Sequence, residues 1–268
     1  MAEKKTHNFV SATGSSSGPQ QAAVHARPRG SAAPRRLGAV LLWLLAIACE
    51  VVAILVFSGK LEITFMPSLW FSIILIVLDL VFVIIGSQLW KKANKIKPAS
   101  KKNGFLFWMW NNMGVLVACV AFFPLIIILL TNKNLDKKTK IIAIAAAVVA
   151  LVIGGAASYD FNPISQEELA SAETAITGDV YWTPFGKVYH THDDCSHLNQ
   201  TDTLTFGSVA DAVAAGRTRL CSTCAKRDEI DTTGILTEER EPDEVNWASG
   251  SGEASSGEAD SGELKTLG

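Results

Sequence analysis

The residues with the clearest potential for chemistry lie in the last third of this 268-residue sequence. The stretch VYHTHDDCSH, residues 188–197, contains three histidines, two aspartates and one cysteine. Further along, Cys221 and Cys224 form a Cys-x-x-Cys pair, whose single tight turn can present two thiolates to the same ion. Thiolate and imidazole are common ligands of structural zinc, so this combination predicts a bound Zn²⁺.

A closed tetrahedral site needs one ligand in addition to three cysteines, and three histidines compete for that position. Four residues separate His190 from the cysteine of the same stretch, which is enough for the chain to turn and for both side chains to converge. His192 falls inside that turn and is the second choice, while His197 can point away. The predicted metal ligands are His190, Cys195, Cys221 and Cys224.

Two other chemistries remain open for these cysteines. A redox Cys-x-x-Cys usually opens a helix in a thioredoxin-like fold, whereas this pair follows Gly216 in a segment too small for that fold. A catalytic zinc keeps an open position for water, which three cysteines and one histidine do not leave. Asp193 and Asp194 are most simply turn residues. The pattern therefore favours structural zinc and no enzyme activity.

The elements that must position these ligands form a small α+β unit, predicted over residues 179–230. The stretch VYWTPFGKVYH indicates two short strands joined by a turn at residues 184–186. The stretch SVADAVAAG indicates a short helix, with Ser208 at its start and Gly216 at its end. The unit has few large apolar side chains, and so small a domain usually needs a staple such as a metal ion.

Residues 37–158, which precede this unit, are typical of a membrane protein. Apolar residues make up 49% of the chain and are concentrated in four blocks. A helix crosses the hydrocarbon core with about 20 apolar residues. The fourth block is shorter and rich in Ala and Gly, so a buried soluble helix is the alternative there. The predicted spans are 37–57, 68–90, 110–131 and 140–158.

The polar segments around these two regions complete the predicted organisation. Residues 1–36 are rich in Ser, Gly, Ala, Pro and Gln and predict a disordered tail, as does the acidic, Ser/Gly-rich segment 231–268. The connector 159–178 contains a short helix, for which Ser165 and Glu168 form a capping box. The predicted fold class is an α-helical membrane protein with four transmembrane helices, a small α+β zinc-binding domain and disordered termini.

The distribution of Lys and Arg near the span ends predicts the orientation. With the N-terminus inside, ten of these residues lie on the cytoplasmic side and five on the other, although the last loop contributes four of the five. Both termini are therefore expected in the cytoplasm, at the plasma membrane. That reducing compartment suits a cluster of free thiols. The net charge of −2 gives no general affinity for nucleic acid.

Two acidic residues, Glu50 and Asp79, lie inside the first two spans, where no Lys or Arg accompanies them. A charged carboxylate at that depth costs about 3 kcal/mol, so a protonated acid or a shared hydrogen bond is expected. One interpretation is a proton or cation path. The other, which we favour, is that these acids hold the helices together, aided by small residues such as Gly154 and Gly155.

The C-terminal unit resembles a known family. The stretch GKVYH, followed by Cys195, a helix and then Cys-Ser-Thr-Cys, resembles the small Ada-like metal-binding domain, and this resemblance covers only residues 179–230. It implies the same four ligands. In the DNA-repair version four cysteines bind zinc and one accepts a methyl group, whereas a histidine replaces one of them here, which argues against methyl transfer. The whole layout also resembles bacterial multi-pass membrane proteins of uncharacterised function.

Two classes of function fit these features. In the first, the membrane region anchors a zinc-binding module that engages a partner at the cytoplasmic face. A protein partner is expected, and nucleic acid is possible but unsupported by the charge. In the second, the four spans move an ion or small solute with the help of Glu50 and Asp79, and the zinc domain regulates them. The first is favoured because the spans contain few polar residues.

Overall fold

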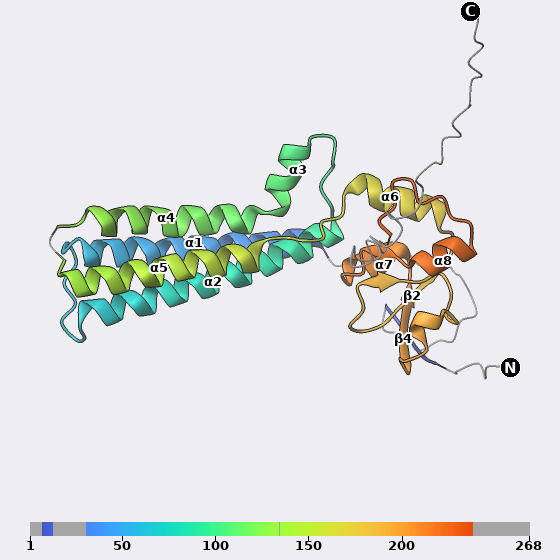
Figure 1. Cartoon of the computed structure of the whole chain (residues 1–268), viewed down its shortest axis with the longest axis horizontal. Coiled ribbons are helices and arrows are strands. Elements are labelled where there is room, and N and C mark those ends of the chain that lie inside the picture. The colour runs from blue at the N-terminus through green and yellow to red at the C-terminus, as the bar shows by residue number, and fades with distance from the viewer. Residues whose placement is uncertain (1–6, 13–30, 134, 238–268) are drawn as a thin grey trace, which may run out of the picture. The chain divides into compact units, whose positions relative to one another are not determined.

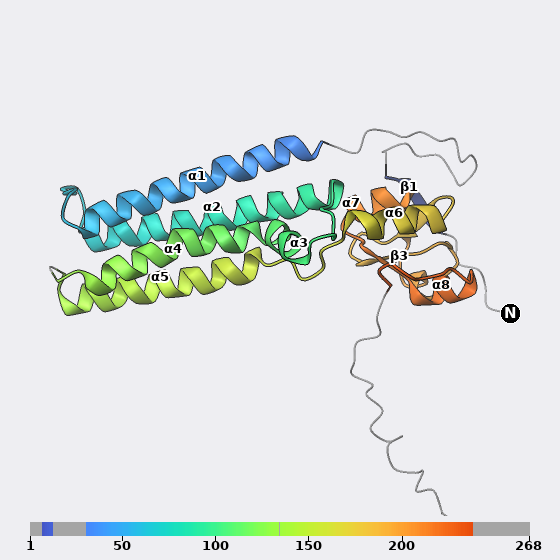
Figure 2. The same ribbon diagram turned by 90° about the horizontal axis from the view of Figure 1, so that it is seen from above.

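The structure is a computed structural model, and it describes residues 7–12, 31–133 and 135–237. Within these residues, four helices are long and apolar enough to cross a membrane. They run side by side as a bundle in both ribbon views (Figures 1 and 2). The chain is therefore a multi-pass membrane protein, as the sequence predicts. The four helices are α1 (Ala32–Phe57), α2 (Ser68–Ile96), α4 (Met113–Thr131) and α5 (Lys137–Ser158).

Polar residues flank most ends of the membrane helices. Helix α1 starts at Ala32, where the Ser31 side chain accepts a hydrogen bond from the Ala33 amide. The predicted third span, 110–131, is two helices in the structure, because α3 (Gly104–Asn111) ends before α4 begins. At this junction the side-chain amides of Asn111 and Asn112 donate to main-chain carbonyls of the preceding turn, which interrupts the helix.

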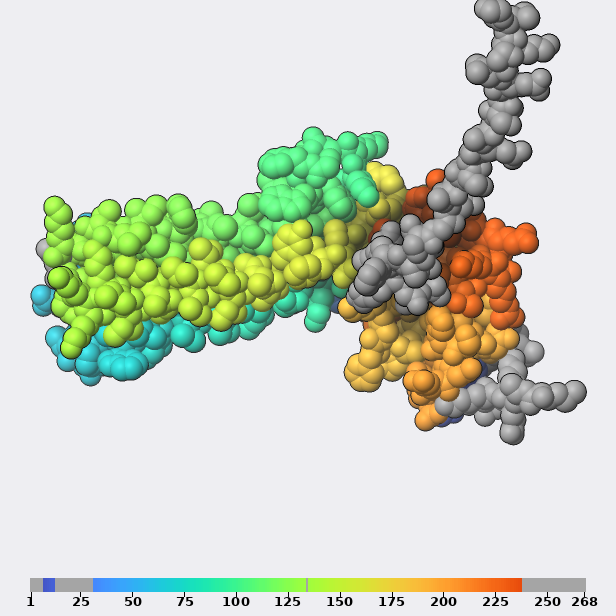
Figure 3. All heavy atoms as spheres, viewed as in Figure 1, coloured from blue at the N-terminus to red at the C-terminus, as the bar shows by residue number. Residues whose placement is uncertain are grey.

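Small residues allow the helices of the bundle to pack closely. The buried positions of α1 and α2 recur at spacings of three and four residues, as in a coiled-coil seam. In α2, Gly86 lies against the ring of Trp43, where a Cβ atom would come within 2.6 Å of the indole nitrogen. The space-filling view shows α4 and α5 in contact along one face (Figure 3). The buried small residues of α1 and α5 include Ala39, Ala46, Ala53, Ala143, Ala147, Ala150 and Gly154.

The C-terminal region contains two small sheets and four short helices among the described residues. One sheet has the strand order β1-β4-β2, and the other pairs β3 with β5 in parallel. The strands are β1 (Asn8–Ser11), β2 (Val180–Trp182), β3 (Val188–Tyr189), β4 (Thr203–Gly207) and β5 (Arg219–Leu220). The helices are α6 (Gln166–Ala175), the 3₁₀ helix η1 (Ser196–Leu198), α7 (Val209–Ala214) and α8 (Ser222–Arg227).

Hydrophobic packing in this region extends beyond residues 179–230 on both sides. Leu169 of α6 and Ile235 pack with Trp182 and Tyr189 in one core cluster. The predicted helix starts are confirmed, because Ser165 and Ser208 both form capping boxes. Gly216 follows α7 with φ of +95°, which L side chains rarely adopt.

The predicted disorder of residues 1–36 is wrong for two stretches of that segment. Residues 32–36 form the first turn of α1, and Asn8–Ser11 form β1, which pairs in parallel with β4. Figure 2 shows β1 in dark blue among the elements of the C-terminal region. In the predicted tail 231–268, Thr237 forms a bridge with Leu220 and is likewise ordered. The rest of both predicted tails lies outside the described residues, apart from a few positions beside these stretches.

Candidate metal centre

Main-chain hydrogen bonds hold the four predicted ligands at the ends of neighbouring elements. His190 follows β3, and its amide and carbonyl both bond to Tyr181, at 2.8 and 2.7 Å. Cys195 directly precedes η1. Cys221 lies between β5 and α8, and its amide donates to the Tyr189 carbonyl at 2.9 Å. Cys224 lies in the first turn of α8, so the end of β3, the start of η1 and the start of α8 together fix the four ligand positions.

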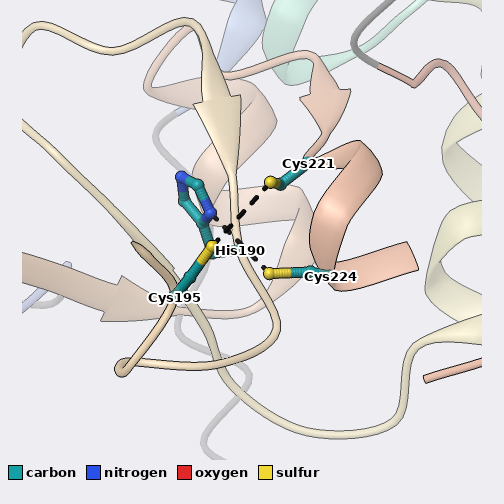
Figure 4. Close-up of side chains that lie close together, drawn as sticks. All are labelled: His190, Cys195, Cys221 and Cys224. Carbon is teal, nitrogen blue, oxygen red and sulfur yellow. Dashed lines mark hydrogen bonds between the residues drawn. The ribbon is translucent and has the colours of Figure 1, made fainter. Parts of the chain in front are cut away.

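The four side chains converge on a common centre. One ligand atom from each of them lies within 4.8 Å of all the others. The Sγ atoms of Cys195 and Cys221 are 4.0 Å apart, and the Cys224 Sγ is 3.8 Å from the His190 Nδ1. Bond lengths of 2.0–2.3 Å around a tetrahedral zinc correspond to ligand–ligand distances of about 3.6–3.8 Å. The observed distances are close to these, and Figure 4 shows all four groups pointing inward.

Burial and covalent state also fit a metal centre. All four residues are buried, with 0–5% of their surface exposed. The cysteines are free, and a sulfur separation of 4.0 Å is about twice the length of a disulfide bond. Three thiols and one imidazole are soft and borderline ligands, which suit zinc better than magnesium or calcium. His190 and the three cysteines are therefore a potential metal-binding cluster compatible with zinc.

The raised pKa values of two of the three thiols oppose metal binding in part. Burial raises the pKa of the Cys195 thiol. A hydrogen bond with Cys224 and burial together raise the pKa of Cys221, and the same hydrogen bond lowers the pKa of Cys224. Metal ligation requires thiolates, so a metal ion entering this cluster must displace protons from at least two buried thiols.

The other two histidines of the stretch lie outside this cluster. The His192 Nε2 is 2.5 Å from the Asp228 Oδ1, and the neighbouring Thr191 hydroxyl donates to the other oxygen of that carboxylate at 2.5 Å. The His197 Nδ1 lies 3.5 Å from the Cys221 Sγ, beside the centre. Sequence reasoning missed this last contact, because a one-turn 3₁₀ helix folds the chain back immediately after Cys195.

The two aspartates between these histidines lie at the surface of the turn that leads to Cys195. Asp193 and Asp194 lie in a turn, as the sequence predicts. The Arg227 guanidinium forms an ion pair with Asp194 at 2.7 Å, which connects this turn to the end of α8. The turn carries Cys195 and the helix carries Cys224, so this exposed pair joins the two segments that supply thiols.

Comparisons with protein-family models, with curated proteins and with solved structures find no match to this chain. The resemblance of residues 179–230 to the Ada-like domain therefore stays a prediction from the sequence. The geometry of the cluster is independent of that resemblance, because it follows from the positions of the four side chains.

Proposed function

We propose that this protein is a membrane-anchored zinc-binding module. It presents residues 179–230, called the metal domain below, at the cytoplasmic face to a protein partner. The observation that carries the proposal is the cluster of His190 with three cysteines, which is buried in a region joined to four membrane-length helices. Four protein ligands fill the positions of a tetrahedral zinc and leave none for water, which supports a structural site without enzyme activity.

The position of β1 supports the proposed topology. Strand β1 precedes the first membrane helix and β4 follows the last one, yet the two strands pair in register. Their pairing requires both to lie on the same side of the bilayer, which an even number of spans permits. The excess of Lys and Arg and the free thiols support the cytoplasm as that side.

Metal analysis of the full chain, purified in detergent, tests the zinc proposal directly. We expect one Zn²⁺ per chain and, after cobalt substitution, intense thiolate charge-transfer bands with tetrahedral d–d absorption. His190→Ala should weaken metal binding severely, whereas the matched control His192→Ala should leave it nearly intact, because that side chain bonds to Asp228 instead. Loss of the bands in the His192 variant alone would show that the ligand assignment is wrong.

Accessibility of the C-terminal end tests the orientation. A single reporter cysteine placed at Ser255 should not react with a membrane-impermeant reagent in intact cells, and it should react after the cells are opened. A cysteine placed at Lys60, in the loop between the first two spans, is the matched control and should react in intact cells. The opposite pair of results would reverse the orientation.

A second candidate function, movement of a proton or cation through the bundle, is favoured by one observation. Both carboxyl oxygens of Asp79 and one of Glu50 are buried without a hydrogen-bond partner in the described structure. Flux in proteoliposomes tests this candidate. A pH-dependent flux that Glu50→Gln and Asp79→Asn abolish would replace the anchoring role proposed for the bundle.

A further inference from the structure

The N-terminal strand β1 belongs to the metal domain in space although the whole membrane region separates them in sequence. The register pairs Asn8 with Thr203 and Ser11 with Phe206. Hydrogen bonds continue past both ends of the strand, from the Asn8 amide to the Asp202 carbonyl at 2.7 Å and from the Ala12 amide to the Phe206 carbonyl at 2.9 Å. The edge of β4 that does not pair with β2 is thus covered by the N-terminal strand β1.

The side chains of β1 alternate as those of a docked peptide do. Phe9 packs against the cluster that contains Cys195, Cys221 and Cys224, and its ring meets Tyr181 edge-on at 6.0 Å. The next residue, Val10, is 47% exposed. Main-chain pairing along a sheet edge, with one side chain packed against apolar residues, is a pattern by which proteins bind extended peptides.

The strand is also connected in a way that allows it to leave. Residues 12–30, a stretch of 19, separate β1 from the Ser31 cap of α1. Fully extended, that many residues reach about 60 Å. A connection of this length permits the strand to leave β4 without breaking the chain, and it makes the strand an intramolecular competitor of any free peptide.

We propose that the edge of β4 opposite β2 is a peptide-acceptor site. Residues 7–12 of the same chain occupy it until a partner displaces them. This inference rests on the proposed function and names its partner class. The partner is an extended polypeptide segment that pairs in parallel with β4 and places an aromatic side chain where Phe9 lies. The chain's own strand then acts as a built-in competitor that covers the flank of the metal cluster.

A peptide-binding experiment on the full chain tests this proposal. The probe is a fluorescent peptide of residues 5–14, KTHNFVSATG, added to zinc-loaded protein in detergent. Protein lacking residues 1–12 should bind it saturably, and the intact chain should bind it at least tenfold more weakly, because its own strand competes. A Phe9→Ala peptide should bind at least tenfold more weakly than the wild-type peptide, whereas a Val10→Ala peptide, changed at an exposed position, should bind equally well.

Zinc content and the cobalt spectrum, measured on the same truncated sample, separate the possible failures. If the truncated protein keeps its metal but ignores the peptide, the acceptor site is refuted and the zinc proposal stands. If removal of residues 1–12 releases the metal from a chain that otherwise binds it, β1 is a permanent part of the domain and is not displaceable. If the intact chain binds no zinc at all, the proposed function itself fails.

Discussion

The membrane bundle and the metal domain bury polar side chains in opposite ways. In the metal domain, the buried His190 and its three cysteines lie within 4.8 Å of one another, where a single ion can satisfy all four. In the bundle, Asp79 is 1% exposed and interacts electrostatically with Glu50, yet neither of its carboxyl oxygens has a hydrogen-bond partner among the described residues.

The difference shows that buried polar groups contribute differently to the stability of the two regions. The ligands of the metal domain stabilise the fold only together, because without an ion these buried groups have only weak hydrogen bonds that involve sulfur. The acids of the bundle are tolerated separately, because each can take up a proton and become neutral. We therefore expect large, collective losses in the metal domain and small effects in the bundle.

Metal removal should produce the largest effect. Structural zinc contributes about 10–16 kcal/mol of apparent binding free energy in small zinc domains, so a strong chelator or Cys221→Ser should unfold the metal domain. Hydrogen exchange should become fast in β3, β5 and α8 and remain slow in α1–α5. The matched control is Cys119→Ser in the bundle, where the cysteine is exposed and outside the cluster. Unchanged exchange in the metal domain after chelation would contradict a structural role for the ion.

Acidification should weaken metal binding steeply. A bound zinc ion would stabilise thiolates and so lower the pKa of each cysteine ligand relative to the metal-free chain. Binding is therefore strongest above the pKa of the metal-free thiols, which burial raises for Cys195 and which a hydrogen bond with Cys224 together with burial raises for Cys221, and it is lost as the pH falls. With two or three protons displaced, the affinity should fall by about 100- to 1000-fold between pH 7.5 and 6.5. Competition with a coloured chelator measures this slope, and a slope of less than one proton would contradict thiolate ligation.

Neutralising the buried acid of the bundle should have a small effect of the opposite sign. Asp79→Asn removes no hydrogen bond formed among the described residues and avoids the cost of a buried charge, so the thermal unfolding temperature in detergent should rise or stay the same. The matched control is Ser158→Ala, which removes the 2.8 Å hydrogen bond to Ser87 and should cost about 0.6 kcal/mol. A clear loss of stability with Asp79→Asn would show that the acid has a partner.

The local features of both regions could be predicted from the sequence. The four membrane helices follow from the length of the apolar blocks, and the capping boxes at Ser165 and Ser208 follow from residues three positions apart. The grouping of His190 with the three cysteines also follows from spacing, because a turn and a knuckle each bring two ligands together. That this group binds metal stays a prediction.

The non-local features could not be predicted in this way. Strand β1 is four residues long and lies beside a Ser/Gly-rich stretch, and the described residues that stabilise it, in β4 and around Phe9, lie far away along the chain. Ile235 follows a polar turn and is buried only because the core of α6 and α7 receives it. Both segments have weak local signals, and tertiary contacts decide their structure.

Within the metal domain, the smallest predicted effect concerns His197, which is neither a predicted ligand nor remote from the centre. Its Nδ1 lies 3.5 Å from the Cys221 Sγ, a distance at which an N–H group can donate a weak hydrogen bond to a thiolate. Such outer contacts typically change metal affinity by about 10- to 100-fold. This one is long and involves sulfur, so we expect His197→Ala to weaken zinc binding by no more than about tenfold. The cobalt d–d bands should keep their tetrahedral form, with a small shift in the charge-transfer bands. Complete loss of those bands would make His197 a ligand. The matched comparison is His190→Ala: if that variant kept the bands, the fourth ligand of the site would be His197 instead of His190.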